Sequence, residues 1–162
     1  MASKYIKNKR GVRKSSPSKI NVISVNSQFI RLKKSFPNLV QEECTKSRFS
    51  VVLRLQPDVF SREYDVRIVY EHGKSVNVFI VNEVLRIATN RTKLPHVYDS
   101  KLQRICLYGR EGGSWSSDKS IASVIVPWVS EWLFYYELWL IDGQWYGGGH
   151  NEYENENIAK DE

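Results

Sequence analysis

Cys106 is the residue of this sequence whose type and setting best suit nucleophilic chemistry. It lies in the short apolar run Ile105-Cys106-Leu107, and the pair Pro95-His96 stands ten residues before it. A thiolate attacks carbonyl carbons, and a nearby histidine can donate a hydrogen bond to the oxyanion that forms. The structural alternative is that Cys106 is a small buried apolar residue. Its position on an aperiodic segment, rather than in a periodic strand, favours the functional interpretation.

Asp118 is the next candidate, in the polar loop that follows the cysteine. A carboxylate beside an incoming amine can orient the amine or accept its proton. The alternative is that Asp118 is solvated or caps the helix that begins after it. We expect Tyr108 and Trp115, in the same loop, to pack rather than to react. His150 follows three glycines, but no strand precedes them and no Lys-Ser/Thr pair follows, so we reject a phosphate-binding loop.

Other kinds of chemistry find little support in the composition. The two cysteines, Cys44 and Cys106, form no CxxC motif, and the three histidines are far apart in the sequence. This pattern disfavours a disulfide framework and a structural zinc site, and it is typical of a reducing compartment. No apolar run is long enough for a membrane span, and no signal peptide opens the chain. We therefore predict a cytoplasmic protein without metal or cofactor.

Several periodic segments must position these candidates. Residues 20–43 predict an N-terminal helix of roughly one to two dozen residues, whose last part Pro37 disturbs. Runs within 48–57, 63–73 and 75–81 alternate as strands of an antiparallel meander of about four strands. Residues 82–98 have no convincing period and predict an extended crossing. From residue 121 a helical stripe buries an aromatic face, with a kink or a helix start at Pro127. The stripe comprises Ile121, Ile125, Trp128, Trp132, Tyr135 and Trp139. The order of elements predicts an α+β domain with long aromatic-rich C-terminal helices.

The formal net charge of +6 is unevenly distributed over the 162 residues. Residues 1–19 hold seven Lys or Arg and no acid, whereas residues 150–162 hold five acids against one lysine. We divide the chain into a basic disordered arm (1–19), a single domain (20–150) and an acidic tail (151–162). A solvated arm is the favoured interpretation, and contact with nucleic acid through phosphate neutralisation is the alternative.

A family resemblance links these motifs. Ubiquitin-conjugating enzymes carry a His-Pro-Asn-(Ile/Val)-(Tyr/Phe) stretch, then Ile-Cys-Leu, then Trp-Ser-Pro and an apolar helix. Similar pieces recur here in that order at residues 94–98, 105–107, 115–116 and 121–126. The aromatic segment "IVPWVSEWLFYYELWLIDGQWYGGGH" resembles a bacterial branch, the ubiquitin-conjugating-like proteins of anti-phage CBASS operons, encoded beside a cyclic-oligonucleotide synthase. The resemblance spans residues 24–140 and is most specific over 94–128.

The sequence departs from the family pattern at four points. His96 stands at the position of the family's asparagine, and Leu94 stands at the position of its histidine. The interval from His96 to Cys106 is two residues longer than usual, and Ser117 replaces the proline of Trp-Ser-Pro. The nucleophile is kept, while the oxyanion donor stays open between the His96 ring and a purely structural histidine that orders the crossing through a backbone hydrogen bond.

The resemblance implies a ubiquitin-conjugating (UBC-like) fold and a catalytic set of Cys106, His96 and Asp118. Cys106 would form a thioester with the C-terminus of a cGAS/DncV-like nucleotidyltransferase, the conjugated partner. The acyl group would then pass to an acceptor lysine on a target protein, which regulates CBASS anti-phage signalling. Since the chain has no nucleotide-binding motif, an activating enzyme acts in trans or the system works without one. The alternative is a non-catalytic binding module of the same fold. A papain-like hydrolase is disfavoured, because Cys106 is not at a helix N-terminus.

Overall fold

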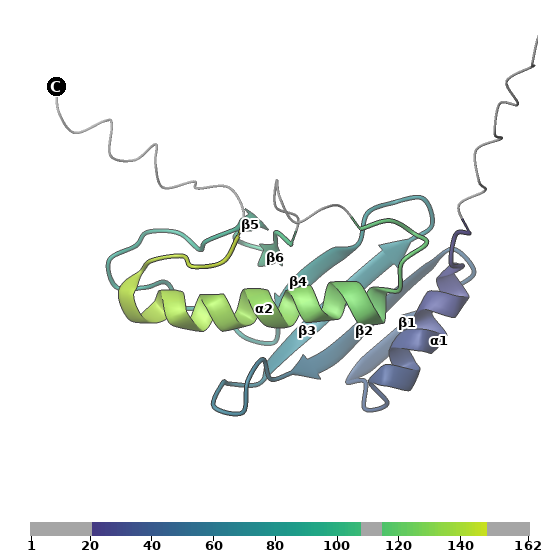
Figure 1. Cartoon of the computed structure of the whole chain (residues 1–162), viewed down its shortest axis with the longest axis horizontal. Coiled ribbons are helices and arrows are strands. Elements are labelled where there is room, and N and C mark those ends of the chain that lie inside the picture. Colours follow the sequence, from purple (N-terminus) through teal and green to yellow (C-terminus); the bar gives the residue numbers. More distant parts are fainter. Residues whose placement is uncertain (1–20, 108–114, 149–162) are drawn as a thin grey trace, which may run out of the picture.

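The computed structural model describes residues 21–107 and 115–148, which form two helices and a six-stranded sheet (Figure 1). This arrangement confirms the predicted α+β class. The basic segment 1–19, the acidic segment 151–162, Tyr108 and His150 lie outside the described residues. In chain order the elements are α1 (Val25–Ser35), β1 (Gln41–Cys44), β2 (Arg48–Leu55), β3 (Tyr64–Glu71), β4 (Asn77–Val81), β5 (Val97–Asp99), β6 (Arg104–Ile105) and α2 (Ile121–Asp142).

The first helix is shorter than the segment 20–43 that the sequence predicts. The Ser24 hydroxyl caps α1 by accepting a hydrogen bond from the Ser27 N–H at 3.2 Å, and the helix ends at Phe36. Pro37 disfavours helical geometry at the residue before it and cannot continue the backbone ladder. The chain therefore turns, and residues Gln41–Cys44 form β1 instead of a last helical turn. That part of the helix prediction is wrong.

The sheet has the strand order β1-β2-β3-β4-β6-β5, and each neighbouring pair is antiparallel. Strands β2 to β4 form the predicted meander, β1 adds a fourth strand at its edge, and β6 lies between β4 and β5. The predicted period-2 alternation is confirmed, because one set of side chains faces the helices and is at most 4% exposed. This set comprises Tyr64, Val66, Ile68 and Tyr70 in β3, Val76 just before β4, and Val78 and Ile80 in β4.

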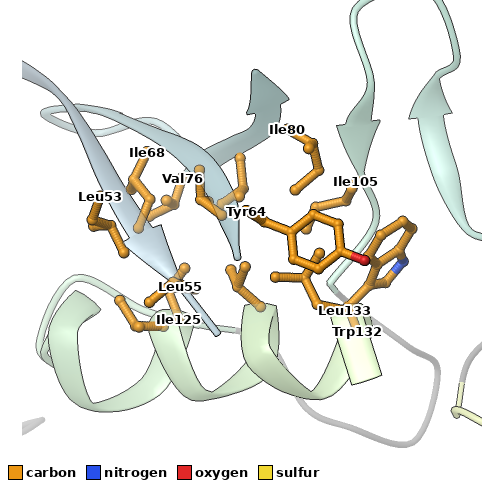
Figure 2. Close-up of a cluster of buried hydrophobic side chains, with 14 of the residues drawn as sticks. Leu53, Leu55, Tyr64, Ile68, Val76, Ile80, Ile105, Ile125, Trp132 and Leu133 are labelled. Carbon is orange, nitrogen blue, oxygen red and sulfur yellow. The ribbon is translucent and has the colours of Figure 1, made fainter. Parts of the chain in front are cut away.

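The core lies between this face of the sheet and α2. Figure 2 shows labelled side chains from β2, β3 and β6 directed toward the helix, with Tyr64 beside Trp132 and Leu133. In Figure 1, α2 crosses one face of the sheet, and α1 packs near the start of α2. The opposite face holds a groove of about 610 Å³ lined by residues of β1 to β4 and by Leu102. The helices thus cover one face of the sheet.

Helix α2 is a single helix of 22 residues, so the predicted start at Pro127 is wrong. Pro127 lies in its second turn, where it removes one backbone donor. The predicted stripe holds for Ile121, Ile125, Trp132 and Trp139, which are buried, whereas Trp128 and Tyr135 are only partly covered. The helix ends at Gly143, whose positive φ of 75° lets its N–H reach the Trp139 carbonyl at 2.7 Å. Neither α1 nor α2 has the apolar length that a membrane-spanning helix requires.

The fold predicts that substitutions of two residues of α2 have very different effects on the free energy of unfolding. Trp139 is 0% exposed and Ile141 is 82% exposed. Trp139→Ala should lower the free energy of unfolding by about 3–5 kcal/mol, because it leaves a large cavity under the sheet. Ile141→Ala should change it by less than about 0.5 kcal/mol. Urea unfolding followed by circular dichroism measures both values, and similar losses in the two variants would contradict this core.

Candidate active site

The main chain holds Cys106 at the end of the short strand β6. Its N–H donates to the His96 carbonyl at 2.8 Å, which prolongs the β5·β6 ladder by one residue beyond the pair Val97 and Ile105. Ile105 is 2% exposed and anchors the strand in the core. Cys106 itself is half-buried and forms no disulfide. Cys106 therefore combines a fixed backbone with partial exposure of the residue to solvent.

The His96 main chain connects the cysteine to α2. Its carbonyl also accepts a hydrogen bond from the Trp132 indole N–H at 3.1 Å. The residue has a positive φ of 45°, a region in which histidine is enriched among non-glycine residues. Its ring is buried and stacks on the Trp145 ring, with centroids 4.8 Å apart. The structure thus brings His96 and Cys106 together through the backbone, and the ring packs against an indole.

Trp145 reaches His96 because the segment after α2 folds back over the crossing. The Arg91 guanidinium donates to the Gly143 carbonyl at 2.7 Å, and the Asn90 amide donates to the Asp142 carbonyl at 2.9 Å. A Cβ at Gly143 would lie 2.0 Å from the Asn90 side-chain oxygen, so glycine permits this close approach. Sequence reasoning did not include Trp145. The available signal was Gly143, because a glycine that ends a helix allows the following residues to fold back over the protein.

Asp118 lies elsewhere, in the turn before α2. It accepts a hydrogen bond from the Ser116 hydroxyl, which together with its own backbone N–H lowers the pKa of the carboxyl. Asp118 is therefore an exposed, ionised carboxylate at neutral pH. The helix cap is Ser120, so Asp118 is not the capping residue. Among the described residues no contact joins Asp118 to Cys106 or His96, and α2 rises roughly 16 Å between Ile121 and Trp132.

The turn that carries Asp118 is held by Gln28, a residue that sequence reasoning missed. Gln28 is 0% exposed, and its amide donates to the Lys119 carbonyl at 2.8 Å while accepting from the Ile121 N–H at 2.9 Å. It therefore satisfies one of the unpaired donors at the start of α2. The available signal was its place three residues after Val25 and four before Leu32, on the buried face of α1.

The remaining candidates have simpler surroundings. The Trp115 ring packs edge-on against Tyr70, with centroids 5.3 Å apart, which agrees with the packing role expected for it. Cys44 is exposed on the edge strand β1, where partial burial and the charge of Glu42 raise the pKa of its thiol. No group of His, Cys, Asp or Glu in residues 21–107 and 115–148 could hold a metal ion.

The fold and the site define a small α+β protein that presents a cysteine on a fixed strand end, next to a buried histidine. A family model described as Type II CBASS E2 protein matches residues 28–152, which are 125 of the 162 residues. The chain belongs to this family, and the match confirms the resemblance to the CBASS branch. A comparison with curated proteins gives no significant match.

The hydrogen bonds of Gln28 predict that removing its amide lowers the free energy of unfolding. Gln28→Leu should lower the free energy of unfolding by about 2–3 kcal/mol, because it removes the hydrogen bond to the Lys119 carbonyl and the acceptor of the buried Ile121 N–H. Asn26→Leu, on the exposed side of the same helix, is the control and should cost less than about 0.5 kcal/mol. Chemical unfolding of both variants gives the comparison. A Gln28→Leu protein as stable as the control would show that the amide contributes nothing.

Proposed function

We propose that this chain is a conjugating-like acyltransferase with a UBC-like fold. Cys106 carries the C-terminus of a cGAS/DncV-like nucleotidyltransferase as a thioester and passes it to a lysine amine of a target protein, which regulates CBASS anti-phage signalling. Membership of the CBASS E2 family supports a role of this kind. The observation that carries the proposal is the half-exposed position of Cys106 on a backbone that the His96 carbonyl holds.

The first step forms the thioester. The Cys106 thiolate attacks the carbonyl carbon of an activated C-terminus, the S–C bond forms, and the activating group leaves with its electron pair. The activated acyl group is an adenylate or a thioester, supplied by an activating enzyme in trans. A thiol suits this step because the resulting thioester stays reactive toward amines. A fixed backbone at Cys106 keeps the sulfur in one place while a flexible polypeptide end reaches it.

The second step transfers the acyl group. The lysine amine attacks the thioester carbonyl, the N–C bond forms, the C–S bond breaks, and the Cys106 thiolate is regenerated while the amine loses a proton. Asp118 is ionised and exposed, so its charge attracts the lysine ammonium. Its predicted contact with the amine stays a prediction, as does an oxyanion contact from the His96 ring.

The role of His96 predicts how two substitutions behave. Asparagine and glycine both tolerate the positive φ at this position, and only asparagine keeps a side-chain donor. We expect His96→Asn and His96→Gly to discharge the thioester to a lysine amine at rates within about threefold of each other, because both keep the carbonyl that holds Cys106. Single-turnover discharge measures these rates. A rate at least tenfold higher for His96→Asn would assign the oxyanion contact to the side chain.

Trapping the carried polypeptide tests the proposed function directly. Wild-type protein co-expressed with its nucleotidyltransferase and the activating enzyme should carry an adduct that a thiol reductant releases, and Cys106→Lys should carry a stable amide instead. Intact mass of the purified proteins measures both adducts. Cys106→Ala should carry none.

Cys44→Ser is the matched control, because Cys44 is the other cysteine and its raised pKa leaves less reactive thiolate. This variant should carry the same adduct as the wild type. An adduct that persists in Cys106→Ala would contradict the assignment of the nucleophile. A stable complex without an adduct on any variant would identify the alternative, a non-catalytic binding module.

A further inference from the structure

A cation that forms no ion pair within the described part of the chain lies two residues before the cysteine. The Arg104 guanidinium carbon stands 4.9 Å from the centroid of the Tyr98 ring, and one of its terminal nitrogens donates to the Asn77 side-chain oxygen at 3.3 Å. The Arg104 Nε is buried and has no hydrogen-bond partner among the described residues. We call Arg104, Tyr98 and Asn77 the Arg104 cluster. It holds the arginine in place from two sides and leaves donors unused.

The Arg104 cluster contains no counter-charge. The ion pairs within residues 21–107 and 115–148 join Lys33 to Glu42, Arg54 to Asp65, Arg62 to Glu83 and Lys74 to Glu71, so none includes Arg104. In the sheet register Arg104 pairs with Phe79 of β4 and with Asp99 of β5, and the Asp99 carboxylate accepts the Leu102 N–H at 2.9 Å. A half-buried guanidinium is costly without an anion, and its planar fork of donors matches a carboxylate.

The strand geometry relates Arg104 to the thiol. Side chains alternate between the two faces of a strand, and Ile105 faces the core. Arg104 and Cys106 therefore belong to the other face, since the Cys106 N–H continues the ladder with β5. At about 3.3 Å per residue their Cα atoms lie roughly 7 Å apart. A polypeptide end attached to Cys106 and running back along β6 would bring a residue a few positions before its terminus to Arg104.

Asn77 extends this face toward the open side of the sheet. Besides accepting from Arg104, it lines the groove that runs over the outer face of β1 to β4. The Arg104 cluster therefore lies between the cysteine and a groove with room for a few further residues of a carried polypeptide.

We propose that the Arg104 cluster recognises an acidic side chain near the C-terminus of the polypeptide that Cys106 carries. The proposal rests on the proposed function and names its substrate class: acyl donors with Asp or Glu within about four residues of the end. Arg104 binds the carboxylate, Asn77 holds the guanidinium, and Tyr98 supports its face. Arg104 is thus a specificity-determining residue.

Synthetic peptide thioesters test this without an activating enzyme. In the probe reaction the Cys106 thiolate attacks the peptide thioester carbonyl, the new S–C bond forms, and a small alkyl thiolate leaves and takes up a proton. Three sets of peptides differ only by Glu, Ala or Lys at the second, third or fourth residue from the thioester. Intact mass against time gives the loading rate of each peptide, and its concentration dependence separates binding from the chemical step.

The wild type should load the best Glu peptide roughly tenfold faster than its Ala counterpart at low peptide concentration, and the Lys peptide more slowly still. The preference should weaken with added salt. Arg104→Gln should abolish it, Arg104→Lys should keep part of it, and Arg104→Glu should favour the Lys peptide. Arg31→Gln is the matched control, because Arg31 is exposed in α1, does not line the groove and should not affect the preference.

Two results would overturn the role of Arg104 without affecting the proposed function. One is equal wild-type loading rates for the Glu and Ala peptides at all three positions, and the other is an Arg104→Gln protein that keeps the wild-type preference. In both cases Cys106 still loads, so the proposed function stands. If no peptide loads Cys106 and the co-expressed wild type carries no adduct, both fail together. Thermal unfolding of each variant excludes misfolding as the cause, and Arg104→Glu adds a reversal of preference that a folding defect would not produce.

Discussion

One main-chain carbonyl, that of His96, joins the parts on which the candidate site depends. It accepts the Cys106 N–H and the Trp132 indole N–H, so the crossing, the cysteine segment and α2 meet at a single oxygen. Both donors are largely shielded from water, where an unpaired polar group is costly. Moving any one of the three segments would leave buried polar groups without partners. The backbone of the cysteine is therefore held by the core of the protein, although the residue is partly exposed.

Helix α2 is the rigid element that relates the two ends of the site. Near its middle Trp132 reaches the cysteine segment, and at its start Gln28 clamps the turn that carries Asp118. The two anchoring points are about three helical turns apart. The candidate residues are thus spread along one helix and are not gathered in an enclosed cleft, which is the usual form of a small-molecule site.

The parts of the fold that could be predicted from the sequence are those with a local period. Alternation from Tyr64 to Tyr70 and the apolar stripe of α2 both follow from which side chains must leave water. Prediction of secondary structure failed where pairing with a neighbouring strand decides whether a segment forms a strand. Residues Gln41–Cys44 are all exposed and carry no strand pattern, yet they form β1 because β2 offers its free edge. Similarly, the helix passes through Pro127, since burial of its apolar face outweighs one lost donor.

The same division applies to the site. The sequence alone identified Cys106 as the nucleophile candidate and related its surroundings to the CBASS branch. This was possible because each motif consists of residues that are close together in the sequence. Only the tertiary structure showed that the His96 contact to Cys106 is made by the backbone, that Trp145 covers the histidine ring, and that Gln28 holds residues more than ninety positions away. Such contacts join distant segments, and their partners are chosen by how the helices and the sheet pack, which no local pattern of residues encodes.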